Sequence, residues 1–371
     1  DDQRPTGYTL AFGDESLPAN ASGVHIDPEP FRRLDGYGLG APIMAVFPDV
    51  DESMLPGRFD IESSVAEDAP IVLLEVQSDG STRRVPYFAE LDVHASDPEQ
   101  QVLFVRPAEI LEMDTRYIVA FRNLQTTGGE DIQPSEAFRK LRDDEVGSGT
   151  VLAERQPRFE EIFTMLSDQN VSRDSLVLAW DFRTASDTAL HSRMLNIRDD
   201  ALETTAPDGP TLEVDNVTEF SEPGGDGEVD EHIALDVEGT FESPRYTRNR
   251  SGPGFVLNTN EEGEVVQNGT RTVDWWMRVP HSAIDGAPHE VVTYGHGLLG
   301  SGADVRAGHL SQIADEYGYI VIAVSWTGMS EDDVGTALSS VSDVSNFIGM
   351  ADRLHQGLVE FLLVTRAAKR Q

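Results

Sequence analysis

The strongest constraint on the fold of this chain is a strand–loop–helix–strand pattern in its last quarter. A short apolar run at 290–294 leads into a glycine-rich loop, and residues 304–317 carry apolar side chains at helical spacing. Residues 319–326 are apolar almost throughout, which is typical of a strand buried on both faces of a sheet. These segments predict a βαβ unit, in which a right-handed crossover joins two parallel strands.

The loop of this unit has the sequence Gly295-His296-Gly297-Leu298-Leu299-Gly300. Glycine lets the backbone turn sharply and leaves the amide groups accessible, because no Cβ atom stands in the way. Two N–H groups directed at one point stabilise the oxyanion of an acyl-transfer intermediate, and the positive end of the following helix adds to this effect. The pattern therefore predicts either an oxyanion-binding loop or a tight turn that serves close packing.

The loop, placed after a buried strand and before a helix, resembles the oxyanion loop of the α/β-hydrolase superfamily in its lipase and esterase branch. The resemblance implies that the backbone N–H of Leu298 is an oxyanion donor, that Gly297 permits the geometry, and that His296 shapes the loop through hydrogen bonds. It extends over residues 232–371, which have the element order of the first half of a hydrolase domain. These elements are an antiparallel pair of strands at 232–238 and 272–279, the βαβ unit, and a helix at 345–368.

The preceding part of the chain has β character. Residues 41–185 contain short apolar or alternating runs separated by turn residues, a pattern that favours a β-sandwich. The expected strands are 41–47, 71–76, 83–91, 101–106, 116–122 and 176–183, with one helix at 158–166. This region resembles the immunoglobulin-like N-terminal domains of some secreted bacterial lipase-like proteins. The expected fold class is mixed: an all-β, sandwich-like N-terminal domain followed by the N-terminal half of an α/β-hydrolase sheet.

Two further segments flank the expected β domain. Residues 1–40 are rich in proline, glycine and acidic side chains and are expected to form an extended lead-in. Residues 186–231 are expected to contain a helix at 187–202 and an acidic linker. The last part of this linker, 222–231, is either a solvated loop or a site for a structural calcium ion.

A nucleophile motif is missing from the sequence. The hydrolase family carries its serine in a Gly-x-Ser-x-Gly turn, and the 371 residues contain no such motif. Ser330 comes nearest, but Asp332 replaces the second glycine and the segment follows the wrong strand, so Ser330 is not expected to be the nucleophile. His309 and His355 are expected to be packing or surface residues. The resemblance places the whole Ser-His-Asp triad beyond Gln371.

The expected half-domain has surfaces that need a partner. In the family's strand order the glycine-loop strand lies between the fourth and fifth strands, so without the fifth its edge is open and prone to aggregation. The helix at 345–368 would also lose cover for its apolar stripe, formed by Phe347, Ala351, Leu354, Leu358, Phe361 and Leu362. We therefore expect the C-terminal remainder of the domain as a partner, made by cleavage near Lys369 and Arg370 or present as a continuation of the chain.

The charge of the chain excludes one class of partner. The 66 acidic residues outnumber the 28 basic ones and give a net charge of −38, which repels the phosphate backbone of nucleic acids. Such a surface suits a salty or extracellular setting, and an alternative is that some carboxylates bind calcium. The chain contains no cysteine, which excludes disulfides and thiolate sites, and it has no apolar run long enough to span a membrane.

The sequence thus predicts the N-terminal part of a secreted serine hydrolase that acts on a carboxylic ester, a lipid or a polyester without a cofactor. This chain would supply the oxyanion loop, and Leu298, Leu299 and Trp326 are candidates for apolar contact with the acyl group. The alternative is a non-catalytic surface binding or assembly protein built on a partial hydrolase scaffold. That alternative explains the missing nucleophile but leaves the open sheet edge in need of another subunit.

Overall fold

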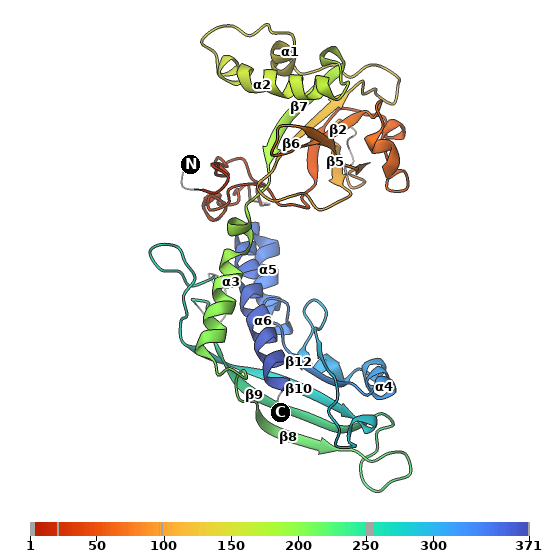
Figure 1. Cartoon of the computed structure of the whole chain (residues 1–371), viewed down its shortest axis with the longest axis vertical. Coiled ribbons are helices and arrows are strands. Elements are labelled where there is room, and N and C mark those ends of the chain that lie inside the picture. The colour runs from red at the N-terminus through yellow and green to blue at the C-terminus, as the bar shows by residue number, and fades with distance from the viewer. Residues whose placement is uncertain (1–3, 21, 96, 98, 249–255, 370–371) are drawn as a thin grey trace. The chain divides into compact units, whose positions relative to one another are not determined.

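The chain folds into a mixed α and β structure with two compact units, which confirms the expected mixed class (Figure 1). The structure, a computed structural model, describes residues 4–20, 22–95, 97, 99–248 and 256–369. Arg370 and Gln371, where a cleavage site and a continuation are expected, lie outside the described residues. One unit comprises residues 1–11 and 31–190, and the other comprises 12–30 and 191–371.

The first unit is built on two antiparallel sheets that share one hydrophobic core. The first sheet has the order β1 (Ile43–Val46), β5 (Val102–Pro107), β4 (Tyr87–Leu91). The second has the order β3 (Thr82–Arg84), β2 (Ile71–Val76), β6 (Arg116–Arg122), β7 (Leu176–Arg183). Tyr87 and Leu103 of the first sheet pack with Leu73 and Phe121 of the second. This arrangement is a sandwich, because apolar side chains on the facing sides of both sheets bury one another.

The sequence predicted one helix at 158–166 in this otherwise β unit, whereas the structure has a longer helix there and another one before it. Helices α1 (Glu136–Arg142) and α2 (Val151–Asp168) cover the outer face of the second sheet (Figure 1). That face is apolar as well, since Val72 and Ile118 point to it and pack with Phe163 of α2. A sheet that is apolar on both faces needs a second covering layer, and the helices provide it.

The run at 83–91, expected to be one strand, divides between the two sheets. Arg83 and Arg84 pair with β2, whereas Tyr87 onward pairs with β5. Pro86 lies between the two parts and has no N–H to donate to a sheet ladder. The chain therefore crosses from one sheet to the other at this proline.

The second unit contains a five-stranded sheet of the order β11 (Val291–Tyr294), β12 (Ile320–Val324), β10 (Thr270–Pro280), β9 (Ile233–Pro244), β8 (Glu213–Glu219). Neighbouring strands are antiparallel except β11 and β12, which are parallel. The predicted antiparallel pair and the predicted parallel strands of the βαβ unit are therefore confirmed.

Strand β8 lies within the segment expected to be a helix and a linker. Its side chains are almost all exposed, so no apolar pattern marks it in the sequence.

Helices lie on both faces of this sheet. Helices α3 (Asp187–Thr204) and α6 (Phe347–Ala368) run side by side on one face, where Ile197 and Leu363 pack with Trp275 (Figure 1). On the other face, η6 (Gly302–Arg306) and α4 (Gly308–Tyr317) cover Val321 and Ala323. Helix α5 (Val334–Ser342) precedes α6. The remaining short 3₁₀ helices are η1 (Glu29–Phe31), η2 (Glu52–Met54), η3 (Ile61–Val65), η4 (Arg173–Ser175), η5 (His281–Ala283), η7 (Glu331–Asp333) and η8 (Val344–Asn346).

Helix α6 buries a different face from the one its apolar stripe predicted. Phe347 and Leu358 are 58% and 40% exposed, whereas Arg353, Gln356 and Glu360 are at most 4% exposed. The prediction was wrong because the three polar side chains find buried partners on other segments, which no periodicity within the helix reveals.

Among the described residues, no helix has the length and apolar character that crossing a lipid bilayer requires.

Candidate active-site loop and the adjacent pocket

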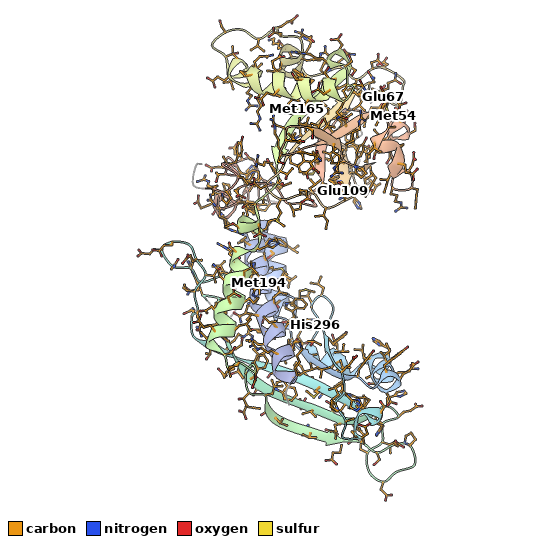
Figure 2. The ribbon with its side chains drawn as sticks, viewed as in Figure 1. Met54, Glu67, Glu109, Met165, Met194 and His296 are labelled. Atoms are coloured by element: carbon orange, nitrogen blue, oxygen red, sulfur yellow. The ribbon has the colours of Figure 1, made fainter. Side chains whose placement is uncertain are left out.

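The glycine loop leaves the carboxyl end of β11 and is fixed from within by His296 (Figure 2). The imidazole is 4% exposed, and its Nε2 accepts a hydrogen bond of 2.8 Å from the backbone N–H of Trp326. Because Nε2 accepts, the proton lies on Nδ1, which donates to the carbonyl oxygen of Gly297 at 2.7 Å. His296 therefore joins the segments that follow the two parallel strands, and both ring nitrogens are occupied.

The loop then makes a tight turn centred on Leu298 and Leu299. The N–H of Gly300 closes the turn on the carbonyl oxygen of Gly297 at 3.0 Å. Leu299 has a φ of +58°, in the left-handed region, which costs a residue with a Cβ atom about 1–2 kcal/mol. Its N–H donates to the carbonyl oxygen of Met329 at 2.6 Å, and this bond holds the strained conformation in place.

Leu298 differs from its neighbour in its backbone bonding. Its side chain is 71% exposed. Among the residues that the structure describes, no group accepts a hydrogen bond from its N–H, whereas the N–H groups of Leu299 and Gly300 are both used. The turn thus leaves the Leu298 N–H without a protein partner beside the bonded N–H groups of Leu299 and Gly300.

A second segment, 328–333, holds the loop from the other side. Gly300 forms a parallel bridge with Ser330. The carboxylate of Asp333 accepts hydrogen bonds from the N–H of Gly328 at 2.7 Å, from the N–H of Ser330 at 2.9 Å and from its hydroxyl at 2.9 Å. Asp333 in turn pairs with Arg353 of α6. Ser330 is 3% exposed and its hydroxyl is part of a capping box, a structural role.

Trp326 lies between the start of the loop and α6. Its indole stacks on Phe361, with ring centroids 5.3 Å apart, and a Cβ atom at Gly295 would lie 3.5 Å from the ring. A Cβ atom at Gly357 would lie 1.9 Å from the indole Cδ1, so the helix must carry glycine there. The expected apolar contact of Trp326 with an acyl group stays a prediction, as does that of the half-buried Leu299.

A buried polar network lies beneath these segments. The Glu360 carboxylate is fully buried and accepts hydrogen bonds from the Thr327 hydroxyl at 2.8 Å and from the Gln356 amide at 2.9 Å. The Arg271 guanidinium lies 3.3 Å away and also donates to Thr327 at 2.8 Å. Burial raises the pKa of Glu360 above its usual range, although these partners oppose that change. The network explains how α6 can bury a carboxylate.

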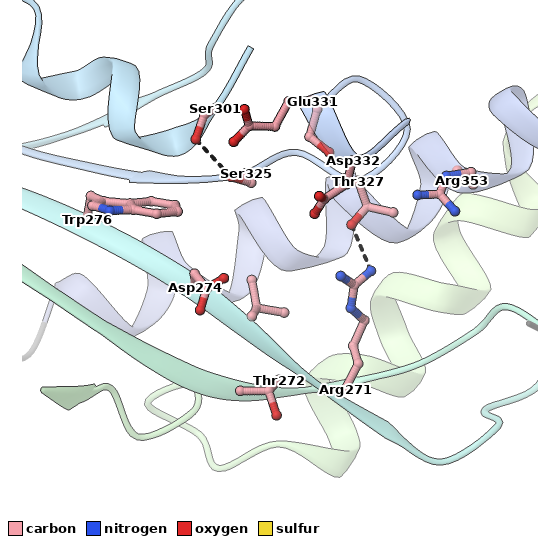
Figure 3. Close-up of a pocket in the computed structure, with 12 residues that line it drawn as sticks. Arg271, Thr272, Asp274, Trp276, Ser301, Ser325, Thr327, Glu331, Asp332 and Arg353 are labelled. Carbon is pink, nitrogen blue, oxygen red and sulfur yellow. Dashed lines mark hydrogen bonds between the residues drawn. The ribbon is translucent and has the colours of Figure 1, made fainter. Parts of the chain in front are cut away.

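A polar pocket of about 430 Å³ lies beside the loop (Figure 3). Its walls are Arg271, Thr272, Val273, Asp274 and Trp276 of β10, Ser301 after the loop, Ser325 and Thr327 after β12, Ser330, Glu331 and Asp332, and Arg353 of α6. Partial desolvation raises the pKa of Asp274, and the negative charge of Asp332 raises it further. Sequence reasoning missed this pocket, because its residues come from four separate segments.

Other residues singled out in the sequence lie elsewhere. His309 is exposed on α4, and His355 is bonded through Nδ1 to the carbonyl oxygen of Ala351 one turn back in α6. Residues 222–231 form a turn-rich loop, and the hydroxyl of Ser221, just before it, donates to the carbonyl oxygen of Asp226. In the described part of the chain, no group of three or more His, Asp or Glu side chains is arranged to hold a metal ion. The calcium ion stays a prediction from composition.

Replacing His296 with leucine should lower the free energy of unfolding by about 2–3 kcal/mol, because the buried N–H of Trp326 and the carbonyl of Gly297 both lose a partner. Urea unfolding followed by tryptophan fluorescence measures this change. The matched control is His309→Leu, since His309 is exposed on the helix after the loop. Equal stability of the two variants would contradict the role given to His296.

No protein-family model, no curated protein and no solved structure matches this chain. The geometry of the loop and of the pocket therefore carries the functional argument alone.

Proposed function

We propose that this chain is the N-terminal part of a secreted serine hydrolase and supplies its oxyanion loop. The observation that carries the proposal is the backbone N–H of Leu298, which has no hydrogen-bond acceptor in the described part of the chain. Leu298 keeps an unused backbone N–H in a loop that is held by hydrogen bonds of His296, Leu299 and Gly300 and by a bridge to Ser330. A rigid donor that needs no reorganisation is what stabilises developing negative charge most effectively.

The topology of the second unit supports the proposal. The resemblance implies that two antiparallel strands precede the glycine-loop strand and that the fourth strand pairs beside it. Strands β9 and β10 are antiparallel, β12 pairs with β10, and β11 pairs parallel with β12. The loop therefore begins at the carboxyl end of a parallel strand, which is where open α/β sheets place their ligands.

The nucleophile would come from a partner. The sequence has no Gly-x-Ser-x-Gly motif, and within the described residues β11 pairs with β12 alone. The other edge of β11 is therefore available to the strand that precedes the nucleophile in the family. We propose that the C-terminal remainder of the domain, as a second chain or a further segment, adds that strand.

In the proposed reaction the partner's serine attacks the ester carbonyl while its histidine takes the serine proton. The Leu298 N–H donates to the oxyanion of the tetrahedral intermediate, together with an N–H beside the nucleophile. The alcohol leaves with the proton from the histidine, and water then hydrolyses the acyl-serine. The substrate class proposed is a carboxylic ester, a lipid or a polyester.

Expression of the native reading frame tests this proposal. We expect a segment with a Gly-x-Ser-x-Gly motif to co-purify with this chain and to be labelled by a fluorophosphonate, and this chain to remain unlabelled. The control is a variant in which this chain is unchanged and alanine replaces the partner's motif serine. If no such segment is encoded or co-purifies, the hydrolase proposal fails for this protein.

One observation favours the alternative of a binding or assembly protein. Helix α5 exposes Val334, Leu338 and Val341, whereas its polar Thr336 and Ser340 are buried. A helix with its apolar face toward solvent is a typical contact surface for another molecule. Co-purification of a partner that no fluorophosphonate labels would favour this function over hydrolysis.

A further inference from the structure

We propose that the polar pocket beside the loop is a binding site for a neutral polyhydroxylated ligand, such as a sugar or a polyol. This inference does not rest on the proposed hydrolase, because it concerns side chains that this chain carries by itself. The pocket volume of about 430 Å³ lies within the range of small-molecule sites.

The pocket offers hydrogen-bond acceptors in the form of carboxylates that have no protein donor. The side chains of Asp274 and Asp332 accept no hydrogen bond from any described residue. They lie close enough for the charge of Asp332 to raise the pKa of Asp274. Two carboxylates that face one cavity and receive no hydrogen bond from the protein are stabilised by a ligand that donates hydrogen bonds to both.

Donors lie on the same walls (Figure 3). The contacts of Arg271 with Thr327 and Glu360 both run through its Nη1 atom, and a guanidinium has five N–H groups, so others are available to a ligand. The hydroxyls of Ser301 and Ser325 lie 3.5 Å apart in the lining, and whichever donates in that contact leaves the hydrogen of the other for a ligand. Both acceptors and donors therefore line the cavity.

A pocket lined by both carboxylate acceptors and guanidinium and hydroxyl donors favours ligands that carry hydroxyl groups. A hydroxyl both donates and accepts, so vicinal hydroxyls can bond a carboxylate and a guanidinium in one pose. Anionic ligands are disfavoured, because Asp274, Glu331 and Asp332 are negative and Arg271 is balanced by the buried Glu360. The half-buried Trp276 gives the wall an apolar patch against which the C–H groups of a sugar can pack.

Ligand binding to the whole chain tests the proposal by saturation-transfer NMR and titration calorimetry. The probes are methyl glucoside and glycerol as neutral polyols, choline chloride as an organic cation, and sodium phosphate as an anion. We expect a neutral polyol to bind in the millimolar range, and Asp274→Ala and Asp332→Ala each to weaken that binding by about tenfold or more. The thermal unfolding of each variant is measured alongside, and both should fold because these side chains are exposed.

The matched control is Glu222→Ala, which also removes one exposed carboxylate. Residue 222 lies in the loop before β9, next to the end where Ile233 pairs with Pro280, whereas the pocket lies at the end where Glu242 pairs with Thr272. We expect this control to change binding by less than about twofold. Absence of polyol binding, polyol binding that survives both aspartate substitutions, or binding of choline alone would each overturn the proposal. None of these outcomes depends on a nucleophile, so failure here is distinct from failure of the hydrolase proposal.

Discussion

Replacing Leu298 with proline should lower the ester turnover of the assembled hydrolase by about a hundred- to a thousandfold, because proline has no backbone N–H. The substitution is suited to this test. Leu298 is the first central residue of the Gly297–Gly300 turn, a position that proline favours, and its own N–H makes no bond within the described chain. The turn should therefore keep its shape while the proposed donor is lost. Initial rates on a short-chain ester measure the effect.

The control for this experiment is Leu298→Ala, which keeps the N–H and removes the exposed side chain. We expect its turnover to stay within about tenfold of the wild-type rate, which separates the backbone donor from any apolar contact of the leucine with substrate. Labelling of the partner's serine by fluorophosphonate should persist in both variants, showing that the nucleophile is still assembled. Unchanged turnover in Leu298→Pro would rule out this N–H as the oxyanion donor.

Replacing Gly357 with alanine should lower the free energy of unfolding by about 3 kcal/mol, although alanine favours helix more than glycine does by about 1 kcal/mol. The added Cβ atom would lie 1.9 Å from the indole Cδ1 of Trp326 and 2.3 Å from the carbonyl oxygen of Thr327. Neither atom can move freely, because Trp326 is also stacked on Phe361 and its backbone is bonded to His296. Urea unfolding measures the loss.

Gly335 in α5 provides the matched control for this helical glycine. A Cβ atom there would meet no other atom within 4 Å, so Gly335→Ala should leave stability unchanged or raise it by up to about 1 kcal/mol. If Gly357→Ala were as stable as Gly335→Ala, the close packing of Trp326 against α6 would not be needed for the fold.

The sequence determined those features that depend on local pattern. The nearly unbroken apolar run of β12, the glycines before η6 and the alternation in β9 and β10 each select an element type, and their order selects a parallel pair beside an antiparallel one. The loop-shaping role of His296 followed from the resemblance, and the partner of its Nε2 is the N–H of Trp326, which is 30 residues away in the sequence.

The tertiary structure alone decided what depends on partners far apart in sequence. Helix α6 buries the face that carries Glu360, because Glu360 bonds to Thr327 and Arg271 there. The periodicity of apolar residues along a helix cannot predict such partners. Residues 213–219 form strand β8 because their backbone pairs with the edge of β9, although almost all side chains of β8 remain exposed. The pocket likewise arises where β10 meets the segments after β12. Hydrogen bonding and burial across distant segments are set by three-dimensional packing, so the glycine loop was visible in the sequence and the polar cavity beside it was not.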